Sequence, residues 1–234
     1  MLFGASSILG YSLFRARPDI TAYCNRQTRK KPAGCAGGID LDEEGPVAEL
    51  FSRIAPSLII QCAGVCDVEN CEKSPEFAWL VNVEAMRILL AHAPPTARIV
   101  YMSSDHVFSG DTGPYDESSP TDPLSVYGRT RVAAEALMLA RPNTIVIRSG
   151  PWIGPSASGK HGHLDWLRYR HGRGLAMTVV ADEARSVVWA EDAARRVWDL
   201  AATELTGVRH LTATHTVGRP ALASYLTERF AIGA

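Results

Sequence analysis

The sequence lacks a continuous apolar run of the roughly 20 residues that a membrane-spanning helix needs. It also lacks a charged and then apolar leader, because Met1 is followed directly by "LFGASS". These two absences argue against a membrane protein and against a secreted protein. We therefore expect a cytoplasmic location.

The sequence also has no recognisable cysteine motif and no excess of positive or negative charge. The five cysteines contain no CxxC pair and no CxxC…His pattern; they are Cys24, Cys35, Cys62, Cys66 and Cys71. A disulfide framework and a zinc site are therefore not expected, and we predict no metal. The formal net charge is −1, so no overall field draws the protein to nucleic acid or to a membrane surface. The one basic run, "RQTRKK" at 26–31, is typical of a solvated loop.

Short apolar runs do occur, and they alternate with segments of helical periodicity. The chain has 234 residues, 46% of them hydrophobic, which is enough for a full core. Strands are predicted over 1–3, 20–24, 57–64, 98–104 and 144–150, and helices over 8–16, 43–54, 76–93 and 127–140. This order predicts an α/β fold, a Rossmann-type doubly wound parallel sheet.

The regular alternation of predicted strands and helices ends after residue 150. A Gly/Ser/His loop precedes a helix over 164–174, an extended piece leads into another helix, and the end is typical of a strand, a turn and a final helix. We expect a dinucleotide-binding domain over 1–150. Residues 151–234 are expected to form a small substrate-binding lobe that is interleaved with the sheet.

The first strand-to-helix turn, "GASSILG", is where a dinucleotide pyrophosphate would lie against a helix N-terminus. Gly4 and Gly10 supply two glycines of the usual fingerprint, but Ser7 occupies the middle position. The glycine pair alone also fits an ordinary turn. Only three residues precede Gly4, so either the first strand is short or the native chain starts upstream of Met1.

Two longer segments carry a resemblance. Residues 56–90 contain D-x-x-x-C-E-x-x-P-x-x-A-x-x-V-N, and residues 97–135 contain S-S-D-x-V-F-x-G, G-P-Y-x-E and P-x-x-x-Y-G. In order and spacing they resemble the extended short-chain dehydrogenase/reductases, and among them the dTDP-4-dehydrorhamnose reductase group. The resemblance covers essentially the whole chain. It implies an NADPH-dependent oxidoreductase that reduces a keto group on a sugar nucleotide or a similar secondary-metabolite intermediate. A homodimer is compatible with the resemblance but does not follow from it.

The resemblance also assigns site residues. It implies that Ser104 binds the substrate carbonyl oxygen, that Tyr127 is the general acid and that Asn82 supports the site. The implied cofactor contacts are Gly4, Ser6, Ser7, Ile8, Leu9, Gly10, Asn25, Arg26, Asp40, Leu41, Cys62, Ala63, Gly64, Asn82, Tyr127 and Arg131. The implied substrate contacts are Val65, Asp67, Ser104, His106 and Trp152. Taken singly, Ser104 also fits a turn cap, Asp40 a cap for the helix near Glu43, and Asn82 a backbone partner.

The catalytic lysine of this family is replaced by Arg131. A cation beside a tyrosine favours the phenolate, and an arginine retains that charge. An arginine cannot release a proton into a relay, so we expect slower turnover than with lysine. Alternatively, Arg131 turns outward and pairs with Glu135, its i+4 neighbour.

Cofactor and substrate preferences follow from departures at other positions. The second predicted strand is followed by Asn25 and Arg26 without an acidic residue, which favours NADP over NAD. His106 stands where the family usually has tyrosine, and Trp152 is displaced by one position from the family tryptophan. These two departures predict a substrate other than dehydrorhamnose. Lys160, His161 and His163 either meet a nucleotide diphosphate or lie on a surface loop.

Two other functions remain open. A non-catalytic dinucleotide-binding regulatory subunit would tolerate Ser7 and Arg131. An epimerase or dehydratase relative would use bound NAD(P) without net consumption. The presence of both Ser104 and Tyr127 favours an enzyme.

Overall fold

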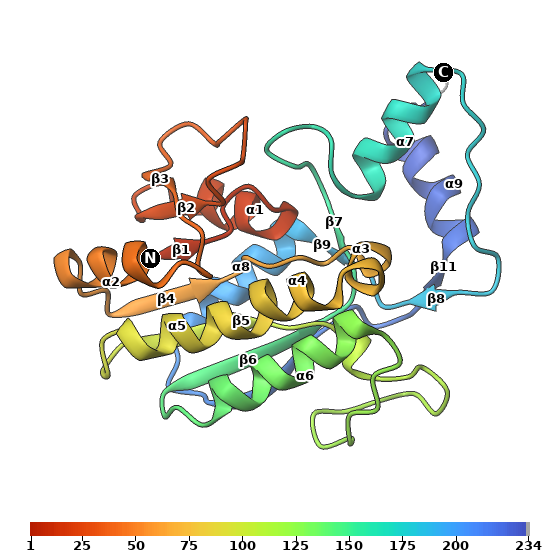
Figure 1. Cartoon of the computed structure of the whole chain (residues 1–234). Coiled ribbons are helices and arrows are strands. Elements are labelled where there is room, and N and C mark those ends of the chain that lie inside the picture. Colours follow the sequence, from red (N-terminus) through yellow and green to blue (C-terminus); the bar gives the residue numbers. More distant parts are fainter. Residues whose placement is uncertain (233–234) are drawn as a thin grey trace.

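A computed structural model describes residues 1–232 and contains a central sheet of seven parallel strands (Figure 1). Its strands are β1 Leu2–Phe3, β2 Ala22–Cys24, β3 Gly37–Gly38, β4 Leu58–Gln61, β5 Arg98–Met102, β6 Thr144–Ser149 and β10 Gly207–Leu211. They lie in the order β10-β6-β5-β4-β1-β2-β3. The strand order therefore reverses between β1 and β4, as in a doubly wound fold. The predicted fold class is confirmed.

Helices cover both faces of this sheet. α1 (Ile8–Ala16) and α8 (Ala190–Ala201) pack on one face, and α2 (Glu44–Arg53), α5 (Ala85–His92) and α6 (Val126–Leu139) on the other (Figure 1). Ile59 and Ile60 are adjacent in β4, and their side chains enter opposite layers of the core. Strands buried on both faces require such continuous apolar runs, and these runs are what predicted the strands from the sequence.

The sheet also includes one strand that was not predicted, β3, and others whose extent differs from the prediction. β3 consists of two glycines, which have no side chains to form an apolar pattern. β10 comes from beyond residue 150 and pairs with β6, so the second half of the chain is interleaved with the sheet. The first strand is short, with two residues. β4 ends at Gln61, before the predicted limit of 64, because residues 62–64 leave the sheet to form a turn.

The remaining elements of the second half form a small unit at one side (Figure 1). β7 (Trp152–Ile153) pairs with β9 (Val188–Trp189), and β8 (Ala184–Arg185) pairs with β11 (Val217–Gly218). α7 (Gly162–Gly172) and α9 (Arg219–Arg229) pack together through Leu164, Leu167, Leu222 and Leu226. The division of the chain at residue 150 stays a prediction.

The predicted helix over 76–93 is interrupted. α3 (Val68–Lys73) and α4 (Pro75–Trp79) lead into a π-helical turn at Leu80–Glu84, and α5 follows. A π turn inserts an extra residue and changes the direction of its side chains, and such turns are frequent at functional sites. This turn contains Asn82. None of the helices within residues 1–232 is long and apolar enough to cross a membrane.

Candidate functional site

The residues assigned from the resemblance gather at the carboxyl ends of β1, β2, β4 and β5. The turn after β1 is built around Gly4, whose φ is +85°, and a Cβ there would lie 2.6 Å from the Ala63 amide nitrogen. A Cβ at Gly10 would lie 2.1 Å from the Gly4 carbonyl oxygen. Both glycines are therefore required by close packing. Ser7 caps α1, its Oγ accepting a hydrogen bond from the Gly10 amide at 3.0 Å.

The end of β2 presents a second group of polar residues. The Asp40 carboxylate accepts hydrogen bonds from the Asn25 amide group and from the Arg26 backbone nitrogen, the latter at 3.1 Å. Asp40 therefore does not cap α2 with its side chain, which was one alternative. The Arg26 guanidinium pairs with Glu43 at 2.6 Å, and both side chains are nearly half exposed. Such a pair is weak, so Arg26 can exchange Glu43 for an anionic ligand.

Asn82 joins the ends of β4 and α6. Its Oδ1 accepts a hydrogen bond from the Val65 backbone nitrogen at 3.0 Å, and its Nδ2 donates to the Val65 carbonyl and to Thr130 Oγ1, each at 3.0 Å. A Cβ at Gly64 would lie 2.8 Å from Asn82 Oδ1 and 2.6 Å from an Arg131 nitrogen. The loop after β4 is thus held against the guanidinium of Arg131.

Arg131 points into the molecule and is 5% exposed. Its Nη1 donates to the Tyr101 hydroxyl at 2.9 Å, and its Cζ lies 5.0 Å from the centre of the Tyr127 ring. Burial acts to lower the pKa of Arg131, but the Tyr101 and Tyr127 oxygens raise it overall, so the guanidinium stays protonated. Its Nε is buried without a hydrogen-bond partner.

Glu135 is not the partner of Arg131. Its carboxylate accepts hydrogen bonds from Arg148 at 2.7 Å and from Ser103 Oγ at 2.5 Å, and Glu135 and Arg148 are both buried. The alternative of an outward Arg131–Glu135 pair is therefore wrong. Periodicity could not decide this, because Glu135 and Arg148 belong to a helix and a strand that meet only in the tertiary fold.

Tyr127 lies between Arg131 and His106. The His106 and Tyr127 rings meet edge to face with centroids 5.4 Å apart, and Tyr127 packs in one cluster with Val65. Ser104 Oγ accepts a hydrogen bond from the His106 amide at 3.2 Å and donates to Asp105 Oδ1 at 3.2 Å. Ser104 thus caps the short turn at Asp105–Val107, and it keeps a hydroxyl donor that rotation can redirect.

A chain of charged residues beside His106 was not found from the sequence. Arg185 donates to Asp105 Oδ2 at 2.8 Å, lies 3.2 Å from His106 Nε2 and pairs with Glu183 at 3.2 Å. Arg219 also pairs with Glu183, at 2.8 Å, and contacts His163. The segment "ADEARS" carries no motif, so only the fold of the second half could bring Arg185 to Asp105.

This network perturbs the ionisation of its members. Hydrogen bonds from Arg219 and Arg185 lower the pKa of Glu183 to about 2, although partial burial opposes the shift. Burial and the charge of Arg185 lower the pKa of His106, and burial and the charge of Arg219 lower that of His163. Both imidazoles are therefore neutral at pH 7.

Other predicted residues have structural roles that the fold makes visible. Asp67 caps α3 through the Asn70 amide at 2.9 Å, and Trp152 packs against the apolar layer under α1. Burial raises the pKa of the Cys62 thiol to about 12, so this residue is neutral. Leu9 and Leu41 are buried in the core, and Ser6 Oγ lies 3.5 Å from Thr28 Oγ1. The roles of these residues toward cofactor and substrate stay predictions.

The residues present fit a dinucleotide. The N-terminus of α1, the turn at Gly4 and the exposed side chain of Arg26 lie at the carboxyl ends of the strands. Arg131, whose Nε is buried without a hydrogen-bond partner, lies against the loop after β4. Across residues 1–232, no group of three or more His, Cys, Asp or Glu residues could hold a metal ion.

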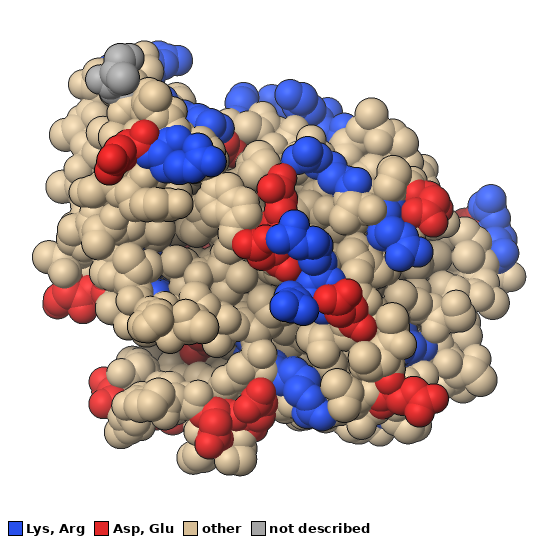
Figure 2. Space-filling view, turned by 180° about the vertical axis from the view of Figure 1, so that it is seen from behind, with Lys and Arg blue, Asp and Glu red and all other residues tan. Residues whose placement is uncertain are grey.

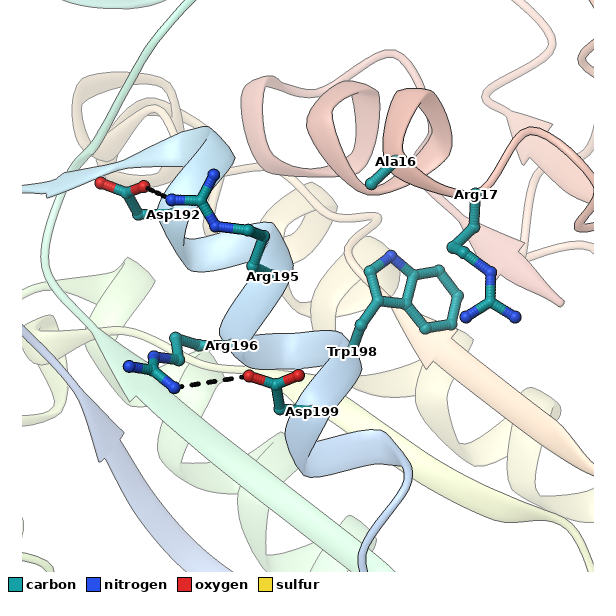
Figure 3. A pocket seen from close by; sticks show the side chains of 7 residues that line it. All are labelled: Ala16, Arg17, Asp192, Arg195, Arg196, Trp198 and Asp199. Atoms are coloured by element: carbon teal, nitrogen blue, oxygen red, sulfur yellow. Dashed lines mark hydrogen bonds and ion pairs between the residues drawn. The ribbon is translucent and has the colours of Figure 1, made fainter.

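A hollow of about 560 Å³ lies elsewhere, between α1 and α8 (Figure 3). The Arg17 guanidinium lies over the Trp198 ring at 5.2 Å, and Arg196 pairs with Asp199 on the same helix. Because its charged residues are paired locally, this hollow offers little to an ionic ligand. Basic and acidic side chains are interspersed on the face seen in Figure 2, where neither sign dominates a large area.

Comparisons with known proteins identify relatives of the chain. A probable dTDP-4,6-dihydroxy-2-methyloxan-3-one 4-ketoreductase of Streptomyces antibioticus is 31% identical over 205 residues, covering 84% of this chain and 65% of the relative. A dTDP-4-dehydrorhamnose reductase of Streptomyces griseus is 30% identical over 210 residues, covering 88% of this chain and 66% of the relative. The chain thus spans slightly less than two thirds of either relative.

A solved structure has the same fold. The dTDP-4-dehydrorhamnose reductase of Bacillus anthracis, in complex with NADP, superposes with a TM-score of 0.83 over 98% of this chain and 79% of that chain, at 23% identity. The family model described as "RmlD substrate binding domain" matches residues 1–233. The chain therefore belongs to this family, the dTDP-4-dehydrorhamnose reductase-like group of the extended short-chain dehydrogenase/reductases.

Proposed function

We propose that the protein is an NADPH-dependent reductase of a keto group on a sugar nucleotide or a similar secondary-metabolite intermediate. The observation that carries this proposal is the position of Tyr127, with a buried cation 5.0 Å from one side of its ring and His106 at its edge. A regulatory binding domain has no need for a phenol held between a buried cation and a histidine ring.

Reduction of a ketone leaves an alkoxide that must be stabilised and protonated. When bound, the nicotinamide supplies the hydride. Tyr127 then gives its phenolic proton to the alkoxide oxygen, and the protonated Arg131 stabilises the phenolate that remains. Ser104 redirects its hydroxyl from Asp105 to the substrate oxygen, and Arg185 keeps Asp105 occupied through two hydrogen bonds.

The cofactor would lie along the strand ends. The pyrophosphate would lie at the N-terminus of α1 beside Gly4, because the first backbone amides of a helix can donate to an anion. Arg26 is proposed to leave Glu43 and bind the 2′-phosphate, and the guanidinium of Arg131 is proposed to donate to the nicotinamide ribose. NADPH is therefore expected to bind more tightly than NADH.

A titration followed by an assay tests the proposal. Fluorescence titration with NADPH and NADH should show saturable binding and preference for NADPH. Oxidation of NADPH should then depend on a dTDP-linked 4-keto sugar, the substrate class in the names of the relatives. Absence of binding to either cofactor would contradict the proposal.

One observation favours the regulatory alternative. Arg131 donates to Tyr101 at 2.9 Å, so one of its nitrogens is already occupied in the core. A regulatory subunit would bind NADPH but would oxidise none of it with any keto sugar. An epimerase or dehydratase relative would convert the substrate without a net change in the cofactor absorbance.

A further inference from the structure

Two thiols meet at the edge of the sheet. Cys24 is the last residue of β2, Cys35 lies shortly before β3, and their Sγ atoms are 3.4 Å apart. Cys24 is 1% exposed, and Cys35 is half-buried. A disulfide has an S–S length of about 2.05 Å, so closing the bond needs an approach of roughly 1.4 Å.

Backbone pairing positions both thiols. Cys24 lies opposite Gly38 in the parallel register of β2 and β3. Cys35 Sγ donates to the carbonyl of Ala22 at 2.9 Å, and the amide of Ala36 donates to the same carbonyl at 2.8 Å. The contact between the sulfurs therefore follows from the strand pairing and does not depend on one loose side chain.

The loop between the two cysteines, residues 25–34, carries the basic run of the sequence. It includes Arg26, the proposed 2′-phosphate partner. A Cβ at Gly38 would lie 2.7 Å from Arg26 Cα, so the Arg26 backbone rests directly on β3. A bond between Cys24 and Cys35 would tie both ends of this loop together, and any accompanying backbone shift would pass to Arg26 through this contact.

We propose that Cys24 and Cys35 are a reversible redox site, and that their disulfide clamps the loop at residues 25–34 and weakens NADPH binding. The disulfide stands on geometry alone, whereas its effect on NADPH rests on the proposed function. The oxidant class is a hydroperoxide, and the reductant class is a dithiol.

The chemistry balances with hydrogen peroxide. The half-buried Cys35 Sγ attacks a peroxide oxygen, the O–O bond breaks, and a sulfenic acid and water result. Cys24 Sγ then attacks the Cys35 sulfur, so the S–S bond forms and the S–O bond breaks. The departing hydroxide takes the Cys24 proton as water. Two thiols and one peroxide thus give one disulfide and two waters.

The environment of Cys24 sets the order and speed of these steps. Burial and the neighbouring Cys35 raise the pKa of Cys24 to about 12, so its thiolate is scarce at neutral pH. Peroxide should therefore react first at Cys35, and the closing step should accelerate as pH rises.

Mass spectrometry tests the bond in the full chain. The exposed Cys66 is first replaced (Cys66→Ser) to remove the most accessible competing thiol. Tryptic cleavage after Arg15, Arg26, Lys30 and Arg53 places Cys24 and Cys35 in different peptides. After peroxide and alkylation, we expect a linked pair of peptides that dithiothreitol separates. The matched variant Cys35→Ser should give no linked pair.

NADPH titration of the reduced and oxidised forms tests the consequence. We expect oxidation to weaken NADPH binding by roughly fivefold or more and NADH binding less, with recovery after reduction. Oxidation to unlinked sulfinic acids would overturn the redox site. An unchanged NADPH affinity despite a complete disulfide would overturn the clamp. If reduced protein binds no NADPH, the proposed function fails, while the peptide linkage still decides the disulfide.

Discussion

Arg131 and Tyr127 lie one turn apart on α6, with the Arg131 Cζ 5.0 Å from the centre of the Tyr127 ring. The same guanidinium bonds to Tyr101 on β5 at 2.9 Å, so the helix holds its cation between two phenols. An arginine reaches both rings because its head is long, planar and forked.

Variants of Arg131 test whether this residue functions in place of the family lysine or has lost its role in the cofactor site. Arg131→Met should weaken NADPH binding by about 10- to 100-fold, which corresponds to roughly 1.5–3 kcal/mol for a charge-assisted hydrogen bond. Arg131→Lys should keep the charge and leave turnover equal or raised. Fluorescence titration and steady-state assays measure both. A Met variant that binds NADPH like the wild type would remove Arg131 from the cofactor site.

Tyr127→Phe should retain the ring between Arg131 and His106 and remove only the proton donor. General acid catalysis contributes roughly 10²- to 10⁴-fold, so kcat should fall by that factor while NADPH affinity stays unchanged. Tyr225→Phe on the exposed face of α9 is the matched control. Full activity of the Tyr127 variant would move the acid elsewhere, with His106 as the first candidate.

Arg26→Ala should weaken NADPH far more than NADH, by about 10- to 100-fold for NADPH if one charge-assisted hydrogen bond to the 2′-phosphate is lost. The control is Arg29→Ala, which removes an equal charge from the same exposed loop. Titration of both cofactors gives the ratio. An equal loss for NADH and NADPH would assign Arg26 to another role.

Glu183→Gln should make the free energy of unfolding less dependent on pH in the acidic range. The hydrogen bonds from Arg219 and Arg185 hold the pKa of Glu183 near about 2, below its ordinary value of 4.5. A depressed carboxylate pKa contributes stability that is full above pH 4.5 and is lost as the pH falls toward 2. Glu183 is one-third exposed, so the effect is modest.

Urea unfolding at pH 7, 4.5 and 3 measures this difference. The Glu183 variant should be less stable than the wild type at pH 7, and the difference in the free energy of unfolding should be clearly smaller at pH 3, because the pKa of Glu183 in the folded protein is about 2. The exposed Glu49→Gln is the control. A constant difference across the three pH values would show that the charge of Glu183 is not responsible.

Glu135→Gln should destabilise the fold strongly, because it leaves the buried Arg148 guanidinium without its counter-charge. Breaking a buried pair costs roughly 3–5 kcal/mol. Ser103→Ala, which removes only the 2.5 Å hydrogen bond to the same carboxylate, should cost about 1.5–3 kcal/mol. Comparable losses in urea unfolding of the two variants would mean that the charge matters little.

Most strands of the sheet, the helices that pack on it and the family could be predicted from the sequence alone. Strands such as β4 and β5 are buried on both faces, so their apolar runs are visible locally. The resemblance assigned catalytic roles to Ser104, Tyr127 and Arg131, and these roles stay predictions. Local pattern also marked the turn at Gly4 and Gly10, because close backbone approach there excludes any side chain. These features leave a mark in a short stretch of sequence, even where the contact that requires them, such as that of Gly4 with Ala63, is distant along the chain.

Only the tertiary structure decided which charges meet. Glu135 pairs with Arg148 rather than Arg131, Arg185 reaches Asp105, and the Cys24 and Cys35 sulfurs face each other across β2 and β3. The strand β3 was not predicted because its two glycines have no side chains to form an apolar pattern. The π turn at Asn82 was not predicted because one inserted residue hardly changes the apolar pattern of a helix. The physical reason is common to all of them. Side-chain pairing between distant segments is set by three-dimensional packing, whereas sequence periodicity reports only which face of an element is buried.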